Sequence, residues 1–229
     1  MKYGKPIIPN SLFLIQVRAW YHKTTIMQLD TVFSLLILIF SVVVHEVSHG
    51  WMANYLGDPT ARLQGRLTLN PLPHIDPIGS VLIPILLFFT NAGIMFGWAR
   101  PVPVNPYNLR GKYGEVMVAA VGPLSNLTLA FIFGLLVRFG GEILPASFIH
   151  IAILAVMVNI VLTIFNIVPI PPLDGSKVLF GVLPYHLQKF REPLERYGFF
   201  IVLIFIAFFW QYLEPVIALV FSLFTGIPL

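Results

Sequence analysis

The side chains with the clearest chemical potential lie in SVVVHEVSHGW, residues 41–51, where His45, Glu46 and His49 end a long apolar run. On a helix, residues four apart lie one turn apart on the same face, so the two imidazoles can bind one metal ion together. Glu46 then lies beside them, where its carboxylate can accept a proton from a water molecule on the ion. Zinc lowers the pKa of such a water to about 7. The pattern therefore predicts a hydrolytic zinc site with Glu46 as its base.

The composition around this motif is that of an integral membrane protein. The chain is 57% hydrophobic and 10% charged, whereas soluble domains carry about 45–50% and about 25%. Ionisable side chains inside a membrane span are costly and usually functional, which favours metal binding over polar packing for the motif. The net charge of +4 comes with no basic run interleaved with aromatic residues. We therefore expect the lipid bilayer, and no nucleic acid, as a partner.

Four segments are long and apolar enough to cross a bilayer, which takes about 20 residues. They are expected at 29–56, 113–139, 148–168 and 198–223. The segment 75–98 is also apolar, but prolines and glycines interrupt it, so it either crosses once or enters and returns. We expect an interfacial N-terminal lead at 1–28 and a single intramembrane domain at 29–229. The predicted fold class is an all-α polytopic membrane protein with four to six transmembrane helices and a short extended or re-entrant segment.

A third metal ligand must come from elsewhere in the chain, because hydrolytic zinc sites usually have three protein ligands and one open position. The chain has no cysteine, so this ligand is His, Asp or Glu. Asp174 is favoured, because the prolines of FNIVPIPPLDG prevent a helix there, and irregular backbone at membrane depth usually lines a cavity. A surface turn is the alternative reading of this stretch. The remaining titratable candidates near apolar sequence are His22, His74, His150, His186, Asp76, Glu115, Glu142 and Glu214.

The motifs together resemble a known family. HEVSHG at 45–50, followed by NIVPIPPLDG at 166–175, is similar to the paired HExxH and NxxPxPxLDG signatures of the site-2 protease family of intramembrane zinc metalloproteases. GPLSN at 122–126 resembles the GPxxN of that family. The resemblance extends over about 35–182 and, without a PDZ-like or CBS-like segment, points to a minimal branch. It implies that His45, His49 and Asp174 bind zinc, that Glu46 is the base, and that Asn166 contacts the substrate backbone.

The requirement that Asp174 reach the same metal ion as the two histidines restricts the topology. If Asp174 meets the two histidines, the first span and the span at 148–168 must end toward the same membrane face, so the segment 75–98 must not cross. The positive-inside rule taken alone prefers a fifth crossing, but a ligand about 30 Å away cannot bind. Loops 57–112 and 169–197 carry nine of the 14 Lys and Arg residues. We therefore expect a multi-pass protein of the cell membrane with its active site toward the cytoplasm.

The stretch GWARPVPVN is expected to be extended, because its prolines exclude a helix. Backbone N–H groups of Trp98, Arg100 and Val102 could pair with an unwound substrate by strand addition; a plain juxtamembrane loop is the alternative. Asn126 is expected either to bond substrate or an oxyanion, or to join helices. His74 is a second-sphere candidate or an ordinary interfacial histidine.

The function these residues favour is that of an intramembrane zinc metalloprotease. It would hydrolyse a peptide bond in or near the membrane span of a transmembrane or membrane-tethered protein, with a zinc-activated water and Glu46 as the general base. Two alternatives stay open. The same His and Asp cluster could serve a metal or small-ion transporter, or the chain could be a catalytically silent membrane binding protein.

Overall fold

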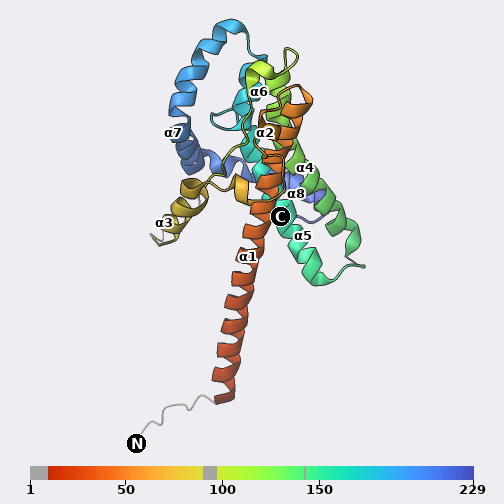
Figure 1. Cartoon of the computed structure of the whole chain (residues 1–229). Coiled ribbons are helices and arrows are strands. Elements are labelled where there is room, and N and C mark those ends of the chain that lie inside the picture. The colour runs from red at the N-terminus through yellow and green to blue at the C-terminus, as the bar shows by residue number, and fades with distance from the viewer. Residues whose placement is uncertain (1–9, 90–96, 142) are drawn as a thin grey trace, which may run out of the picture.

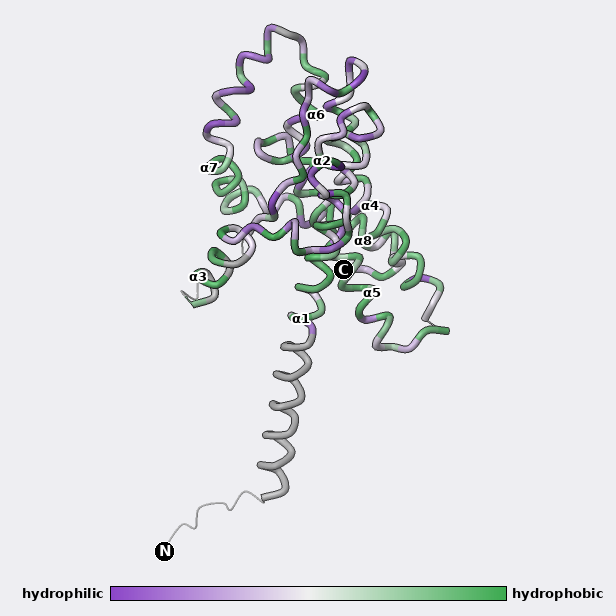
Figure 2. The backbone as a smooth tube through the Cα atoms, in the orientation of Figure 1, coloured by the Kyte–Doolittle hydropathy of each residue, from purple (hydrophilic) through white to green (hydrophobic). Residues whose placement is uncertain are grey.

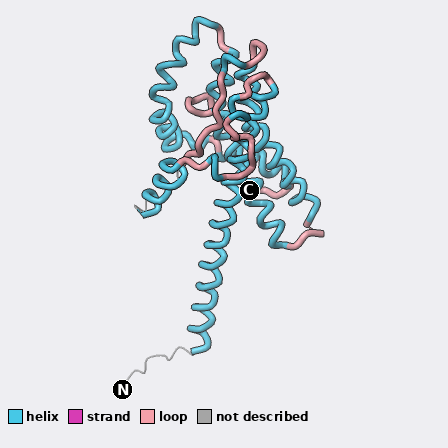
Figure 3. Tube along the Cα trace, in the orientation of Figure 1, coloured by secondary structure: helices cyan, strands magenta, loops and turns pink. Residues whose placement is uncertain are grey.

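The computed structural model describes residues 10–89, 97–141 and 143–229, and all regular structure in this part of the chain is helical (Figures 1 and 3). Among the described residues, four helical stretches are long and apolar enough to cross a membrane, at Asp30–Tyr55, Gly114–Gly140, Ala146–Ile167 and His186–Tyr212. The all-α polytopic expectation is confirmed, with the number of spans at the lower end of the predicted range.

The helices in chain order begin with α1 (Asn10–Tyr55), α2 (Thr60–Leu63), η1 (Leu72–His74), the π-helical turn η2 (Pro77–Leu82), α3 (Ile83–Phe89) and η3 (Pro106–Asn108). They continue with α4 (Gly114–Gly140), α5 (Ala146–Ile167), α6 (Asp174–Val182), η4 (Tyr185–Phe190), α7 (Arg191–Phe209), η5 (Trp210–Tyr212) and α8 (Glu214–Thr225).

The central bundle consists of α1, α4 and α5, with α4 packed against both of the others. The short connection at 141–145 makes α4 and α5 antiparallel neighbours, so α1 and α5 run in the same direction (Figure 1). Buried small residues on α4, Gly122, Ala130 and Gly134, let the helices approach closely. An apolar core lies where α8 joins α4 and α5, around Val156 and Ile160. This packing determines which side chains of α1 and α4 lie opposite each other.

The C-terminal part differs from the prediction. The apolar run at 198–223 is not one span: α7 ends at Phe209, and α8 begins at Glu214. The spanning stretch is His186–Tyr212 instead. Pro215 lies in the first turn of α8, a position that tolerates proline, whereas within a continuous helix proline removes a hydrogen bond and clashes with the preceding turn. The chain therefore turns before Pro215, and α8 places Ile217 and Phe221 in the core.

The two ends of the segment 75–98 are hydrogen-bonded to each other. The backbone N–H of Trp98 donates to the carbonyl of Gly79 over 3.2 Å, and the Ser80 hydroxyl donates to the carbonyl of Trp98 over 2.8 Å. A single crossing would have left Gly79 and Trp98 near opposite faces of the bilayer. The described part of the segment, η2 and α3, projects from the bundle (Figure 1), while residues 90–96 lie outside the described residues. The contact between Gly79 and Trp98 fits the re-entrant alternative and not a single crossing.

The polar stretches of the chain gather at one end of the bundle. Figure 2 shows hydrophilic backbone around α2, the neighbouring loops and the beginning of α7, while most of α5 is hydrophobic. Apolar side chains on α1 face outward, including Leu35, Leu36 and Phe40, each at least half exposed. Such an apolar exterior suits contact with lipid.

Candidate metal centre

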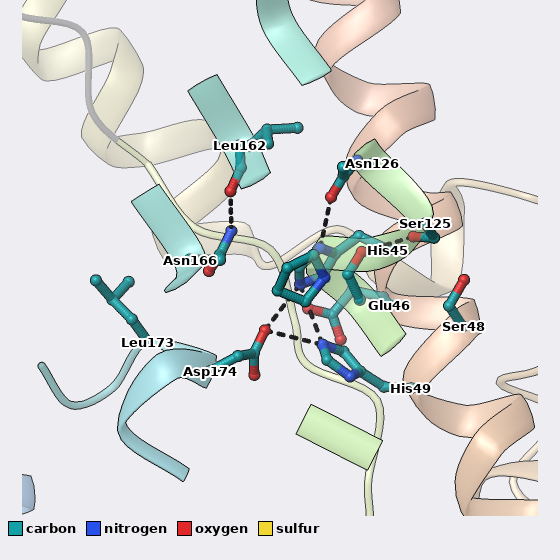
Figure 4. Close-up of polar contacts among 12 residues, drawn as sticks. His45, Glu46, Ser48, His49, Ser125, Asn126, Leu162, Asn166, Leu173 and Asp174 are labelled. Carbon is teal, nitrogen blue, oxygen red and sulfur yellow. Dashed lines mark hydrogen bonds and ion pairs between the residues drawn. The ribbon is translucent and has the colours of Figure 1, made fainter. Parts of the chain in front are cut away.

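Three side chains that are distant in sequence converge beside α4 (Figure 4). The Oδ2 atom of Asp174 lies 3.0 Å from the Nε2 atom of His45 and 3.0 Å from the Nε2 atom of His49. The two Nε2 atoms are themselves 3.0 Å apart. All three residues are buried, at 6–7% exposure. The two imidazoles come from successive turns of α1, and the carboxylate comes from the first residue of α6.

The hydrogen bond of His49 fixes its tautomer. Its Nδ1 atom lies 2.6 Å from the backbone carbonyl of Val118 on α4. A carbonyl oxygen can only accept, so Nδ1 carries the proton in the neutral ring. The lone pair on Nε2 then faces His45 and Asp174.

The same reasoning applies to His45, through a chain of amides. Asn126 donates its Nδ2 group to the side-chain carbonyl of Asn159 over 2.9 Å and to the carbonyl of Ser41 over 3.2 Å. Its Oδ1 atom is therefore the acceptor that faces Nδ1 of His45, at 2.6 Å. In the neutral ring of His45, Nδ1 then carries the proton and the lone pair of Nε2 faces the centre of the cluster. Asn126 and Asn159 are both fully buried, so the orientation of the ring is set within the bundle.

With both imidazoles neutral, these tautomers direct the Nε2 lone pairs toward each other and toward Oδ2 of Asp174, an arrangement that suits a cation. Tetrahedral zinc with nitrogen and oxygen ligands at about 2.0–2.1 Å would separate its ligand atoms by about 3.3 Å. The separations of 3.0 Å within the cluster are close to that value. In the described part of the chain, these residues form the one group of three or more potential ligands that could hold a metal ion. The donor set, two imidazoles and a carboxylate, suits zinc.

Backbone packing brings Asp174 to this place. The chain leaves α5 at Ile167 and passes through the proline-rich turn, and α6 begins directly at Asp174. A Cβ atom on Gly175 would collide with the carbonyls of Ile167 and Val168, so only glycine permits the close return of the chain. Lys177, one turn along α6, donates to Oδ1 of Asp174 over 3.2 Å. Oδ1 is held by the lysine, and Oδ2 faces the histidines.

Gly122 on α4 lies against the imidazole rings. A Cβ atom built there would come within 3.0 Å of atoms in both His45 and His49. The next residue, Pro123, lies inside α4, and its carbonyl accepts from the Thr163 hydroxyl of α5 over 3.2 Å. The GPLSN stretch therefore supplies room for the rings through Gly122 and the acceptor for His45 through Asn126.

Glu46 lies between the two histidines in sequence and beside them in space (Figure 4). Its Oε2 atom accepts a hydrogen bond from the backbone N–H of Val102 over 2.8 Å. Glu46 is not among the residues whose ligand atoms converge. The Glu46 carboxylate thus lies near the cluster, and the extended segment holds it through the N–H of Val102.

The extended segment at 97–105 is confirmed as non-helical, but its N–H groups are engaged within the chain. Trp98 donates to the carbonyl of Gly79 and Arg100 to the carbonyl of His74, while Val102 donates to Glu46. A substrate strand could pair with these three groups only after the internal bonds open. Their role in substrate binding stays a prediction.

Of the two remaining predicted residues, Asn166 lies at the site and His74 lies outside it. Asn166, on the last turn of α5, donates its amide to the carbonyl of Leu162 over 2.9 Å and lies on the side of the site next to Asp174 (Figure 4). His74 is buried and bonds the carbonyl of Thr68 over 3.0 Å, so it belongs to the loop that supports the extended segment and not to the cluster.

Other candidates for the third ligand are engaged elsewhere. Asp76 caps η2, Glu115 pairs with Arg191, and His150 pairs with Asp30. Glu142 and the side chain of His22 lie outside the described residues. Asp174 is the acid that reaches the two histidines in the described part of the chain.

Comparison with known proteins places the chain in a family. The model of peptidase family M50 matches residues 136–209, a stretch that contains Asn166 and Asp174. The chain is 42% identical over 178 residues to "Putative zinc metalloprotease YwhC" of Bacillus subtilis, covering 73% of this chain and 76% of that protein. It is 30% identical over 214 residues to "Putative zinc metalloprotease Rip2" of Mycolicibacterium smegmatis, covering 86% and 79%. No solved structure matches the chain. The chain therefore belongs to peptidase family M50, the site-2 protease family, and is a membrane metalloprotease.

Proposed function

We propose that the chain cleaves a peptide bond in or near the membrane span of another membrane protein, with zinc held by His45, His49 and Asp174. The observation that carries this proposal is the convergence of three potential ligand atoms, each 3.0 Å from the others, inside an apolar bundle. Family membership supports the reaction class. The position of the cluster on spanning and membrane-proximal helices supports a substrate that is itself in the membrane.

Zinc at this site would supply a Lewis acid and lower the pKa of a coordinated water to about 7. The chain's own residues do the rest. Val118 and Asn126 hold the two imidazoles in the tautomer that leaves Nε2 free to bind. Lys177 holds the outer oxygen of Asp174, which favours binding through Oδ2 alone. Glu46 accepts the proton of the attacking water and later returns it to the leaving amine.

The substrate must be locally unwound, because a peptide bond within a helix has its carbonyl hydrogen-bonded and shielded. Asn166 lies beside Asp174 and carries a side-chain amide suited to a backbone contact. We assign it to the substrate backbone. The extended segment at 97–105 would border the unwound stretch on the Glu46 side.

The proposal is tested by purifying the protein in lipid nanodiscs, measuring zinc per chain, and presenting a panel of tagged single-span proteins. We expect about one zinc per chain and cleavage of at least one panel member, with the cut mapped by mass spectrometry to its membrane span or its edge. A transporter with the same cluster would instead move zinc across sealed vesicles and leave every panel member intact. That result would contradict the proposal, as would zinc below a tenth of an ion per chain.

The active site is proposed to face the cytoplasm, because the loops on its side carry most of the basic residues. The chain has no cysteine, so single cysteines report sidedness cleanly. We expect Gln64→Cys and Lys189→Cys to be shielded in intact cells from a membrane-impermeant maleimide, and Ile143→Cys, on the α4–α5 connection, to be labelled. Labelling of positions 64 and 189 on opposite faces would contradict the four-span topology; labelling of both from outside would contradict the orientation.

Replacing Gly122 by alanine is expected to weaken zinc binding by about 10- to 100-fold, which corresponds to an overpacking cost of about 1–3 kcal/mol. The added methyl group would press on both imidazole rings and shift their Nε2 atoms. Zinc affinity is measured by competition with a chelator. Gly141→Ala is the matched control, because a Cβ there meets nothing within 4 Å. Equal zinc affinity in both variants would show that the rings do not hold the metal in this arrangement.

A further inference from the structure

The base Glu46 is connected to a buried arginine through a single peptide group. The N–H of Val102 donates to Oε2 of Glu46 over 2.8 Å. The carbonyl of Pro101, which belongs to the same planar peptide unit, accepts from Nη2 of Arg66 over 3.2 Å. A trans peptide directs its C=O and N–H to opposite sides. Arg66 and Glu46 therefore lie at the two ends of one amide.

Arg66 holds this stretch of backbone at a second point. Its Nη2 group also donates to the carbonyl of Arg100 over 2.9 Å, and the N–H of Arg100 donates to the carbonyl of His74 over 2.8 Å. Arg66 is only 7% exposed, so its guanidinium is held by contacts within the protein. Backbone at residues 100–102 is thus clamped on both sides.

The far end of the segment is fixed to Asp58, in the turn that follows α1. The N–H of Asn105 donates to Oδ2 of Asp58 over 2.7 Å, and the Asn108 amide donates to Oδ1 over 3.0 Å. Burial alone would raise the pKa of Asp58, but these bonds and those from Thr60 hold the pKa below its usual value. Asp58 is therefore an ionised anchor, and the segment is attached to Glu46 on α1 and to Asp58 in the turn after α1.

The charges are arranged to strengthen the central bond. Burial and the neighbouring charge of Arg100 lower the pKa of Arg66, while the Glu46 carboxylate opposes this shift; a guanidinium stays charged at neutral pH. A positive charge on the carbonyl of a peptide polarises its N–H into a better donor. The Glu46 carboxylate thereby gains an oriented donor at Oε2.

The geometry points to Arg66 as a positioning residue for Glu46, acting through the Pro101–Val102 peptide. This inference rests on the proposed role of Glu46 as the base. It assigns the extended segment a task besides bordering the substrate, namely fixing one oxygen of the base so that the other faces the water. Arg66 touches neither the cluster nor the substrate in this scheme.

The test compares Arg66→Met, Arg66→Lys and the matched control Arg62→Met, whose arginine is exposed on α2. Cleavage of one panel member that the wild type cuts is measured as kcat and KM, with zinc per chain determined on the same samples. We expect Arg66→Met to lower kcat by about 10- to 100-fold with KM and zinc content unchanged. Arg66→Lys should recover most of the loss, because an ammonium can still donate to a carbonyl, and Arg62→Met should match the wild type.

A second measurement does not depend on turnover or on recovery of Arg66→Met. Deuterium uptake is followed in the peptide covering 99–105, where prolines at 101 and 103 leave few exchanging amides. We expect faster uptake in Glu46→Ala than in Arg66→Lys and Arg62→Met, because only Glu46→Ala removes the acceptor of the Val102 amide. Unchanged uptake in Glu46→Ala would overturn the inference.

The outcomes distinguish a failure of the positioning role of Arg66 from a failure of the proposed function. An inactive Glu46→Gln together with a fully active Arg66→Met would overturn the inference and leave the proposed function intact. A loss in Arg66→Met that appears in KM or zinc content would assign Arg66 to the fold and overturn the positioning role. Wild-type cleavage by Glu46→Gln would overturn the proposed base itself.

Discussion

Glu46→Gln is expected to keep about one zinc per chain and to cleave substrate about 10²- to 10⁴-fold more slowly than the wild type. Glutamine has nearly the same shape, and its amide oxygen can still accept the Val102 N–H that Oε2 of Glu46 accepts now. It cannot take up a proton at the pH of the reaction. Because Glu46 is not part of the converging ligand set, metal binding should be unaffected.

The measurement pairs metal analysis with cleavage rates on the same preparation. Glu192→Gln is the matched control, since it makes the same substitution at an exposed position in the first turn of α7. Full activity in Glu46→Gln would remove the general base from the mechanism. Loss of zinc in Glu46→Gln would make Glu46 a ligand and contradict the geometry of the cluster.

Asp174→Ala is expected to lower zinc from about one ion per chain to near zero and to abolish cleavage. Hydrolytic zinc sites rely on three protein ligands, and this substitution leaves only the two imidazoles. The carboxylate also offsets the positive charge of the ion in a buried place, where an uncompensated charge is costly. The zinc content is measured after dialysis against a weak chelator.

Asp30→Ala serves as the control for Asp174→Ala. It removes a carboxylate of the same type, 2.8 Å from His150 and outside the cluster. Its zinc content and activity should equal those of the wild type. Zinc retained in full by Asp174→Ala would show that another residue completes the site.

The sequence was sufficient for those parts of the site that depend on local geometry. His45 and His49 share a helix face whatever the rest of the chain does, because the α-helix has 3.6 residues per turn. Asp174 could be predicted from the lack of cysteine, the prolines before it and the resemblance to the M50 family. The re-entrant course of 75–98 followed once Asp174 was required to meet the histidines.

Other features depend on how helices pack, and no local pattern encodes them. The Val118 carbonyl can accept from His49 only because α4 crosses α1 at that height. In the sequence, Gly122 looks like an ordinary interruption of a helix, and only the structure shows that it lies against the imidazole rings. The hydrogen bond between Asn126 and Asn159 likewise depends on the packing of α4 against α5. The engaged N–H groups of Trp98, Arg100 and Val102 likewise required the tertiary partners to be known.

The division of the last apolar run was missed for a local reason. Hydropathy continues through residues 198–223, and Glu214–Pro215 interrupts it too briefly to register as a loop. Proline's exclusion from a continuous helix is nevertheless a local rule. Attention to Pro215 would have predicted the separate helix α8.

The central claim is that two imidazoles and one carboxylate bind a single zinc ion within the membrane domain. X-ray absorption at the zinc edge of the wild-type protein tests it most directly. We predict a first shell of nitrogen and oxygen only at about 2.0–2.2 Å, with the outer-shell scattering of two imidazole rings. A first shell with one imidazole or none, in a protein that cleaves its substrate, would contradict the account.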